Sequence, residues 1–434
     1  MRDELSDVTL CAPSAKTRQR YWYINIHIPF VLFPSVSFII ASEMASNDST
    51  VTLTAHCLCK AHTFTATIPA SKLPLEAWAC HCNSCRHVTG ALYSIDAHWP
   101  EPRANVDTSG LKSFAFSSRI IVLFCGTCST PIFFDHAGDN DEPLGVFTGA
   151  LTNDAGNLVK IAHHIYVEDT LDGGATMWLR KPNVDGSEAK RWKKRSTGEG
   201  AEEYPPEWPA PETLTGYDGK KEDSIPIRCK CKGVNLVLHR GNYAGKKREE
   251  LPWFTDPNTH KSVVGNCACD SCRLFSGIDL FNWAFTELKY VSYLDGVPEP
   301  FPQSSHELRA LVDAKAPQLG TLAYYSSSPD IQRYFCSNCS ACIFYAADDR
   351  SEMINVAVGV LEASDGARAE GFFSWSFGKV GKPGRHNDTE GGWRESLIKH
   401  VEAESEKWRE ERGYPKNWRR VEREEAEKKG ESYY

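Results

Sequence analysis

Short runs rich in Val, Ile, Thr, Phe and Tyr recur along the middle of the chain, and each is bounded by Gly, Pro, Asn or Asp. Runs of this length and composition that end in turn-forming residues are typical of β-strands. Helical periodicity is weak before the C-terminal segment, so the pattern predicts a mainly β protein. The predicted strands are residues 51–54, 62–68, 120–124, 131–134, 234–238, 321–325 and 343–346.

Two segments depart from this strand pattern. Residues 181–224 combine Pro, Gly, Ser and charges of both signs without apolar periodicity, which is the composition of a linker. This linker separates a first domain at 51–180 from a second domain at 225–378. Residues 379–434 alternate in charge, which predicts a tail of one or two exposed helices.

Residues 21–41 form the only long apolar stretch, which on length alone could be a membrane anchor or a signal sequence. Pro29 and Pro34 would interrupt a helix, and Asn25 and His27 would place polar groups at the depth of the hydrocarbon. We therefore predict that the protein has no membrane partner. Residues 1–43 are interpreted as an extension, which would be non-native sequence with no functional content if Met44 is the true start.

Composition and charge narrow the function classes. With 41% hydrophobic and 24% charged residues, the 434-residue chain resembles a soluble protein of several domains rather than a disordered or multi-span membrane protein. The net charge of −8 gives no basic footprint for nucleic acid. The one basic run, residues 190–195, lies in the linker, where solvation or a localisation tag explains it better than nucleic-acid binding.

Sixteen cysteines carry the strongest signal, because fourteen of them recur in the same order on both sides of the linker. Each half has a C-x-C pair, a C-x-C-x-x-C triplet that continues into Arg and then Gly, and a C-x-x-C pair. An internal repeat of this kind predicts two domains of one architecture in tandem. The remaining cysteines are Cys11 and Cys342, which we interpret as incidental thiols; the triplets continue into Arg86 and Gly90, and into Arg273 and Gly277.

The C-x-C and C-x-x-C pairs of each half make up a four-thiolate set, which is the ligand set of a structural Zn²⁺ site. Such a site would join the first strand of a repeat to a hairpin near its end and contribute directly to folding. Disulfides in a secreted protein are the alternative, which the poor geometry of a C-x-C disulfide disfavours. The two predicted sets are Cys57, Cys59, Cys125 and Cys128 in the first repeat, and Cys229, Cys231, Cys336 and Cys339 in the second.

The triplets leave a fourth position open, as in a catalytic zinc site that binds water or a substrate atom. The alternatives are that a distant His or Asp completes a second structural site, or that a triplet holds no metal. With both kinds of site filled, the chain would bind up to four Zn²⁺. The triplets are Cys80, Cys82 and Cys85 in the first repeat, and Cys267, Cys269 and Cys272 in the second.

This order of cysteines resembles the glutathione-dependent formaldehyde-activating enzyme and centromere protein V family, in the tandem form found in fungi. The resemblance implies a fold of two tandem zinc-binding β-sandwich (β-tent) domains, each with a structural zinc and a catalytic zinc on the triplet. Residues 163–165 and the later run at 173–179 are similar to the closing segment of the family domain. The second repeat lacks the matching histidine, so the catalytic set is predicted to be Cys80, Cys82, Cys85 and Arg86.

The activity implied by the resemblance is that of a carbon-sulfur lyase acting on adducts of an aldehyde with glutathione or a related thiol. Arg86, His87 and Lys60, or Arg273 and Lys232 in the second repeat, could bind the carboxylates of glutathione, although each could equally be an ordinary surface or structural charge. The alternative function is a non-catalytic zinc module that binds protein or chromatin. The predicted location is the cytoplasm, and the sequence does not indicate an oligomeric state.

Overall fold

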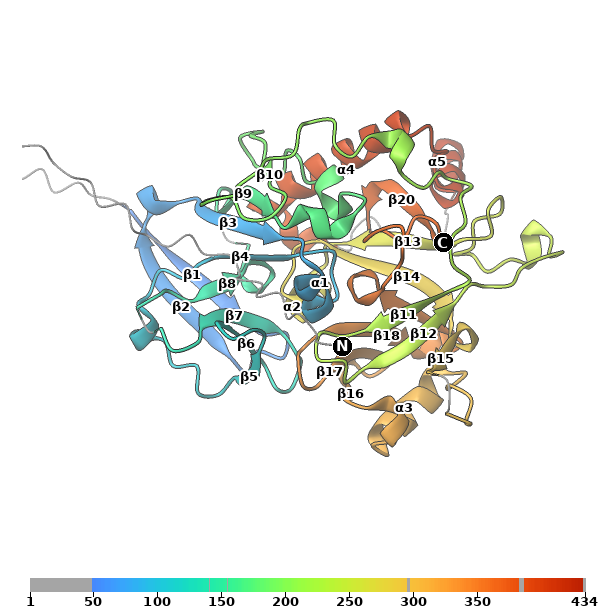
Figure 1. Ribbon diagram of the computed structural model, residues 1–434, viewed down its shortest axis with the longest axis horizontal. Coiled ribbons are helices and arrows are strands. Elements are labelled where there is room, and N and C mark those ends of the chain that lie inside the picture. The colour runs from blue at the N-terminus through green and yellow to red at the C-terminus, as the bar shows by residue number, and fades with distance from the viewer. Residues whose placement is uncertain (1–48, 140, 154, 295–296, 382–385, 432–434) are drawn as a thin grey trace, which may run out of the picture.

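The computed structural model describes residues 49–139, 141–153, 155–294, 297–381 and 386–431 (Figure 1). The predicted extension at 1–43, the apolar stretch within it and Cys11 lie outside the described residues. Among the residues that are described, no helix combines the length and the apolar character needed to cross a membrane.

The first half of the chain forms a β-hairpin and a larger sheet. The hairpin pairs β1 with β2, and the sheet has the strand order β10-β9-β3-β4-β8-β7-β6-β5. One short helix, α1, follows β3. The elements are β1 (Thr50–His56), β2 (Thr63–Pro69), β3 (Leu75–Cys80), α1 (Asn83–Thr89), β4 (Ser94–His98), β5 (Lys112–Ala115), β6 (Ile120–Phe124), β7 (Pro131–His136), β8 (Gly145–Phe147), β9 (Val159–Ile165) and β10 (Lys190–Arg191).

The second half repeats this plan. A three-stranded sheet in the order β11-β12-β15 takes the place of the hairpin, and the larger sheet has the order β16-β17-β18-β19-β14-β13-β20. The elements are β11 (Ser224–Arg228), β12 (Asn235–His239), β13 (Ser262–Cys267), α2 (Asp270–Ser276), β14 (Phe281–Glu287), β15 (Val291–Tyr293), α3 (Ser305–Asp313), β16 (Leu322–Ser328), β17 (Ile331–Cys336), β18 (Cys342–Ala347), β19 (Met353–Ala357) and β20 (Phe373–Val380).

The two larger sheets share one topology. From β9 the first sheet runs β9-β3-β4-β8-β7-β6-β5, and from β20 the second runs β20-β13-β14-β19-β18-β17-β16, with the strands of each sheet in the same chain order. In both, the strand that carries the first cysteine of the triplet pairs in parallel: β3 with β9, and β13 with β20. The mainly β, tandem architecture predicted from the sequence is therefore confirmed.

The two repeats meet along a buried seam, where reciprocal backbone hydrogen bonds join them. Gly359 N–H donates to the Gly90 carbonyl at 2.8 Å, and Gly149 N–H donates to the Gly277 carbonyl at 2.9 Å. Gly90 and Gly277 end α1 and α2 in the left-handed conformation, with φ of 78° and 74°. A Cβ on Gly90 would lie 2.3 Å from the Cys342 carbonyl oxygen, so the seam requires glycine there.

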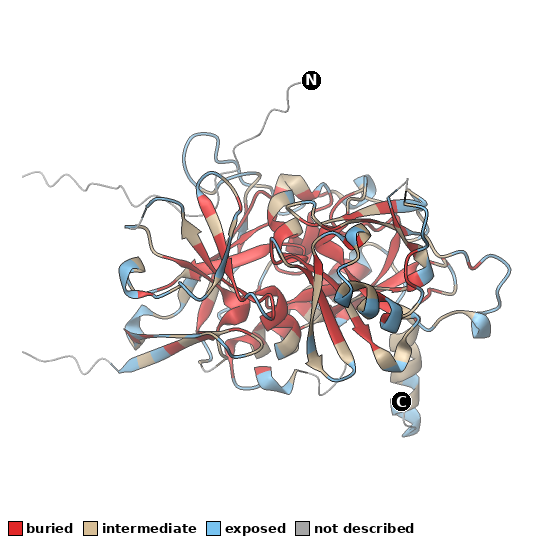
Figure 2. Ribbon diagram, turned by 90° about the horizontal axis from the view of Figure 1, so that it is seen from below, coloured by how far each residue is buried: buried red, intermediate tan, exposed pale blue. Residues whose placement is uncertain are grey.

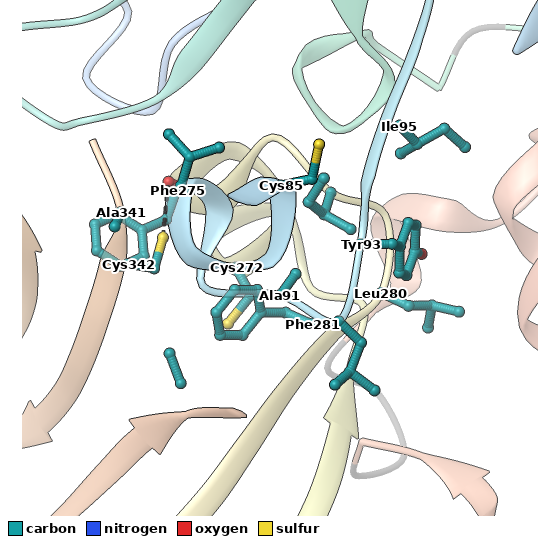
Figure 3. Close-up of a cluster of buried hydrophobic side chains, with 14 of the residues drawn as sticks. Cys85, Ala91, Tyr93, Ile95, Cys272, Phe275, Leu280, Phe281, Ala341 and Cys342 are labelled. Atoms are coloured by element: carbon teal, nitrogen blue, oxygen red, sulfur yellow. Dashed lines mark hydrogen bonds between the residues drawn. The ribbon is translucent and has the colours of Figure 1, made fainter. Parts of the chain in front are cut away.

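A single hydrophobic core crosses this seam. Figure 3 shows Cys85 and Tyr93 of the first repeat in one cluster with Phe275, Leu280 and Cys342 of the second. Burial is concentrated in the centre of the molecule, where the repeats join (Figure 2). Because the core is shared, the tandem repeats are expected to depend on each other for stability.

The segment 181–224 has little regular structure, but its strand β10 pairs in parallel with β9 of the first repeat. Arg191 in β10 is buried and donates to the carbonyls of Pro205, Pro206 and Trp208 at 2.6–2.9 Å. In the basic run at 190–195, Lys190, Lys193 and Lys194 pair with glutamates. Acidic partners therefore neutralise much of this basic run.

The C-terminal segment is helical, as predicted, but its first helix is not exposed. The tail consists of α4 (Trp393–Glu411) and α5 (Trp418–Lys429). An apolar face of α4 packs on β20 and buries Trp393, Leu397 and Val401, whereas α5 has no buried residue. The expectation of solvent-exposed helices is therefore wrong for α4. The alternating charges masked an apolar stripe at helical spacing.

Candidate metal centres

The first four-cysteine set is assembled from two turns. Cys57 and Cys59 lie in the turn from β1 to β2, and Cys125 and Cys128 lie in the turn from β6 to β7. The sulfurs of this set all lie within 4.8 Å of one another. Cys59 Sγ is 3.5 Å from Cys57 Sγ and 3.6 Å from Cys125 Sγ, and backbone N–H groups donate to two of the sulfurs.

The second set is built in the same way. Cys229 and Cys231 lie between β11 and β12, whereas Cys336 ends β17 and Cys339 lies in the turn to β18. Cys231 Sγ is 3.6 Å from Cys229 Sγ and 3.4 Å from Cys336 Sγ. In both repeats, the residue after each cysteine pair has a left-handed backbone conformation that turns the chain around the sulfurs: Lys60, Ser129, Lys232 and Ser340.

The donor chemistry of these two sets fits zinc. A tetrahedron with metal–sulfur bonds of about 2.3 Å has edges of about 3.8 Å, close to the sulfur separations in both sets. The described cysteines are all free thiols, so the disulfide interpretation does not hold for them. Hydrogen bonds from Cys125 and then Cys57 lower the pKa of the Cys128 thiol, and bonds from Cys229 and then Cys336 lower that of Cys231. Hydrogen bonds within the same sets raise the pKa of Cys57 and Cys229, so the sulfurs of each set share protons with one another.

The first triplet lies where β3 passes into α1. Cys80 ends β3, Cys82 caps α1 by accepting the Cys85 N–H at 3.3 Å, and Cys85 lies in the first turn of the helix. These three sulfurs also lie within 4.8 Å of one another, and no described His, Asp, Glu or further Cys joins them. All three residues are at most 1% exposed.

A pair of histidines, one of them between the first two cysteines, lies against this triplet. His81 Nε2 is 3.0 Å from His164 Nδ1, and His164 Nε2 is 2.8 Å from the Leu179 carbonyl oxygen. Burial lowers the pKa of His164 to about 4, which keeps this imidazole neutral at pH 7. The neighbouring His163 instead accepts the indole N–H of Trp192 at its Nδ1, at 3.1 Å. Of the two histidines at 163 and 164, only His164 therefore contacts the triplet segment.

Arg86 lies beside the first triplet with part of its hydrogen-bonding capacity unused. Its side chain is 5% exposed, and Nη2 donates to Asn83 Oδ1 at 2.6 Å. Its Nε and Nη1 are buried and have no partner. Asp169, which is near enough to act on Arg86 electrostatically, accepts the Asn83 N–H at 3.0 Å. Buried donors without a partner are uncommon in proteins, and a bound ligand or ion is one explanation for them.

The next residue, His87, lies among positive charges from both repeats. Burial, Arg86, Lys230 and Arg228 together lower the pKa of His87 to about 3. The imidazole is therefore neutral at pH 7, and His87 does not supply a cation for a substrate carboxylate. This result removes one of the cations that the sequence suggested.

The second triplet has a different environment. Cys267 and Cys269 are partly exposed, and only Cys272 is buried. Cys272 Sγ is 3.4 Å from Trp283 Nε1 and 3.6 Å from the buried Arg333 Nη1. Hydrogen bonds from Cys267 and then Cys269 lower the pKa of the Cys272 thiol, and Arg333 and Trp283 lower it further.

Arg273 of the second triplet has its partners within the protein. Its Nε donates to the Ala268 carbonyl at 3.0 Å, and its Nη2 forms an ion pair with Asp388. Ala268 occupies the place of His81 between the first two cysteines of the triplet. In β20, Val380 lies opposite Asn266, whereas in β9 His164 lies opposite Ala79. The histidine missing from the sequence of the second repeat is therefore missing from the site.

The other sequence candidates lie elsewhere. Lys60 and Lys232 are exposed turn residues of the C-x-C segments. Cys342 is a buried thiol that donates to the Phe275 carbonyl at 3.3 Å. Lys230 and Arg333 carry no signal in the sequence, because each reaches a triplet only through folding, Lys230 across the seam and Arg333 across the sheet.

Comparison with known proteins gives one match. The family model described as glutathione-dependent formaldehyde-activating enzyme matches residues 52–169 and again residues 255–374. The second match begins after Cys229 and Cys231, so it covers the triplet and the C-x-x-C pair of that repeat but not its C-x-C pair. No curated protein matches the chain, and no solved structure matches it. Since the two matches cover more than half of the chain and coincide with the repeated sheets, the protein belongs to the glutathione-dependent formaldehyde-activating enzyme family.

Proposed function

We propose that the protein is a zinc-dependent carbon-sulfur lyase acting on adducts of an aldehyde with glutathione or a related thiol. The observation that carries the proposal is the first triplet, in which three sulfurs have no fourth described ligand and the adjacent Arg86 retains two buried, unpartnered N–H groups. Membership of the family supports the class of substrate.

The proposed reaction is the reversible cleavage of an S-hydroxymethyl thiol. The carbon–sulfur bond breaks, the electron pair of that bond goes to sulfur, the hydroxyl oxygen loses its proton as the carbonyl forms, and the thiol regains a proton. Zinc held by Cys80, Cys82 and Cys85 would supply a positive charge that stabilises the thiolate or polarises the oxygen. Arg86 would bind an anionic group of the substrate, and the pair His81 and His164 would hold the triplet segment in place.

We propose two zinc ions in each repeat and four in the chain. The four-cysteine sets would be structural sites, because their ligand sets are complete. The triplets would be the sites with a position open to a substrate. A reducing compartment such as the cytoplasm is part of this proposal, since it keeps the cysteines available as thiolates.

We assign catalysis to the first repeat. There the unpartnered N–H groups belong to Arg86, whereas Arg273 in the second repeat is paired with Asp388. In the second repeat, Arg333 and Trp283 already contact the sulfur of Cys272. One observation favours the opposite assignment, because the second triplet is the more exposed of the two.

The second candidate function is a non-catalytic zinc module that binds another protein. The complete burial of the first triplet favours it, since a buried triplet is also expected at a purely structural site. The discriminating experiment follows adduct formation from glutathione and small aldehydes by NMR, against a control without protein because the reaction also proceeds spontaneously. Acceleration by the zinc-loaded chain supports the lyase, and its absence with every aldehyde supports the binding module.

A further inference from the structure

The two repeats differ in how their C-x-C segments take part in the seam. In the second repeat, Lys230 lies between Cys229 and Cys231 and reaches across to α1 of the first repeat. Its N–H donates to the His87 carbonyl at 2.9 Å, and its Nζ donates to Ser84 Oγ at 2.7 Å. The residue at the same place in the first repeat is Leu58, which carries no charge and donates its N–H to Thr130 of its own repeat at 2.9 Å.

Lys230 thereby brings a fixed positive charge to the first triplet. Ser84 lies in the first turn of α1, between the cap residue Cys82 and Cys85. The Lys230 ammonium is close enough to Cys82 to act on its sulfur electrostatically, and it lies 5.1 Å from the centre of the Phe116 ring. The hydroxyl on one side and the ring on the other hold this half-buried side chain in one position.

The neighbouring charges leave Arg86 and Lys230 as the cations that could receive an anion. Arg228 is paired with Glu362 at 2.6 Å, and Arg368 is paired with Glu370 at 2.8 Å. Within the described residues, neither Arg86 nor Lys230 forms an ion pair, and the carboxylates of Asp172, Asp169 and Glu362 act on Arg86 only from a distance. Arg86 also has two buried N–H groups without a partner, and a buried donor left unsatisfied is destabilising.

A carboxylate is the anion whose chemistry suits these two cations. Its two oxygens can accept from the free N–H groups of a guanidinium and from an ammonium at the same time, and hydrogen bonds between charged groups are the strongest available here. We propose that Arg86 of the first repeat and Lys230 of the second form a carboxylate-binding subsite at the seam, beside the first triplet. Its ligand is a carboxylate of the glutathione part of the adduct, an assignment that rests on the proposed function.

This subsite gives the second repeat a role in the site of the first. The second triplet has no equivalent subsite, because Leu58 stands in place of Lys230 and Arg273 is bound by Asp388. The second repeat would thus contribute Lys230 to substrate binding, whatever its own triplet does.

The direct test is the binding of S-methylglutathione, which keeps both carboxylates but has no free thiol, to the zinc-loaded full chain by calorimetry. We expect Lys230→Met to raise Kd about tenfold, as befits the loss of a charge-assisted hydrogen bond, and Lys230→Arg to restore most of the affinity. Lys246→Met is the matched control, because Lys246 is an exposed lysine of the same repeat that also lies over an aromatic ring, that of Tyr243 at 5.7 Å. The control variant should bind like the wild type.

Metal content and the unfolding midpoint of each variant show whether the C-x-C site is intact. If Lys230→Met loses zinc, Ser84→Ala takes its place, because it removes the hydroxyl that holds the ammonium without altering the C-x-C segment. Unchanged affinity in an intact variant overturns the subsite, and so does a wild type that does not bind S-methylglutathione.

Kinetics separate the subsite from the proposed reaction. With the glutathione adduct, Lys230→Met should raise KM about tenfold with little change in kcat, whereas with the adduct of mercaptoethanol, which has no carboxylate, KM should not change. Equal losses with both thiols would contradict a carboxylate subsite. If the wild type accelerates no adduct but Lys230→Met still weakens S-methylglutathione binding, the lyase proposal fails and the subsite stands.

Discussion

The two triplets share one cysteine spacing and one position in the fold, yet their surroundings differ. At the first triplet, Arg86 has unpartnered N–H groups and His164 lies against His81. At the second, Arg273 has Asp388, and Arg333 and Trp283 contact Cys272. The arginine that follows the second triplet is therefore paired within the protein, whereas the arginine that follows the first retains N–H donors that a substrate can pair with.

The comparison shows how a duplicated domain can diverge without losing its fold. Arg333 stands three residues before Cys336, where the first repeat has Val122 three residues before Cys125. Trp283 lies opposite Gly265 in the position where Asp96 lies opposite Trp78. Substitutions at these two places change the chemistry around a triplet while the strand pairing stays the same.

The largest expected effect on stability comes from removing a cysteine from one of the four-cysteine sets, which occur in both repeats. Cys125→Ser should remove a structural site that contributes about 10 kcal/mol or more to folding. Because the core is continuous across the seam, protection from hydrogen exchange should fall in both repeats, contrary to what two independent domains would show. Cys342→Ala removes a buried thiol outside the sets and should leave the exchange pattern close to that of the wild type. Loss confined to residues of the first repeat would contradict a shared core.

The next effect concerns the buried ion pair that joins α4 to the seam. Arg394 Nε donates to Asp279 at 2.7 Å, and Arg394 Nη2 donates to the carbonyls of Thr148 and Leu151 in the other repeat. Arg394→Met should lower the free energy of unfolding by about 3–5 kcal/mol, because Asp279 is left buried and unpaired. Urea denaturation measures the loss, with the exposed pair of Lys399 and Glu395 as the control. Lys399→Met should change stability by about 0.5 kcal/mol or less.

A smaller effect is expected from the cation at the second triplet. Arg333→Met removes the guanidinium beside Cys272 and should weaken metal binding by the second triplet about 10- to 100-fold, the usual range for a partner of a metal ligand. Competition with a chelator measures this affinity. Arg350→Met is the matched control, because Arg350 lies over the same Tyr345 ring as Arg333 but has no contact with a sulfur. Equal affinities in the two variants would show that Arg333 does not tune the triplet.

The smallest effect, taken over one pH unit, concerns Asp96 in the first repeat. Burial raises the pKa of Asp96 to about 8, so the folded protein holds a proton that the unfolded chain releases near the ordinary pKa of 3.8. Stability should then fall as pH rises from about 4 to about 8, by at most about 1.4 kcal/mol for each pH unit. Asp96→Asn should remove this slope, as measured by urea denaturation at pH 5, 6 and 7. A slope identical to that of the wild type would show that Asp96 is ionised in the folded protein.

Much of the site could be predicted from the sequence, because cysteine spacing reflects local geometry. The C-x-C and C-x-x-C pairs each form one turn, and the structure brings together the sets and triplets that the repeat suggested. The seven strands predicted from composition correspond to β1, β2, β6, β7, β12, β16 and β18. The short helices α1 and α2 escaped detection because seven residues are too few to show helical periodicity.

The seam and the charges around the triplets could not be predicted. Gly90 faces Cys342, and Lys230 bonds to Ser84, through contacts between residues far apart in the chain that have no local signal. The burial of Arg394 is also invisible in a segment of alternating charges. Such contacts depend on how the two sheets pack, which the pattern of a single strand or helix does not encode.

The most direct test of the account compares Cys82→Ser with Cys269→Ser in the NMR assay of adduct formation from glutathione and a small aldehyde. The account predicts that Cys82→Ser abolishes turnover while metal stays bound to Cys57, Cys59, Cys125 and Cys128. Cys269→Ser should reduce turnover by less than about tenfold, which corresponds to about 1.4 kcal/mol of transition-state stabilisation. Equal loss in both variants, or greater loss in Cys269→Ser, would contradict the assignment of catalysis to the first repeat.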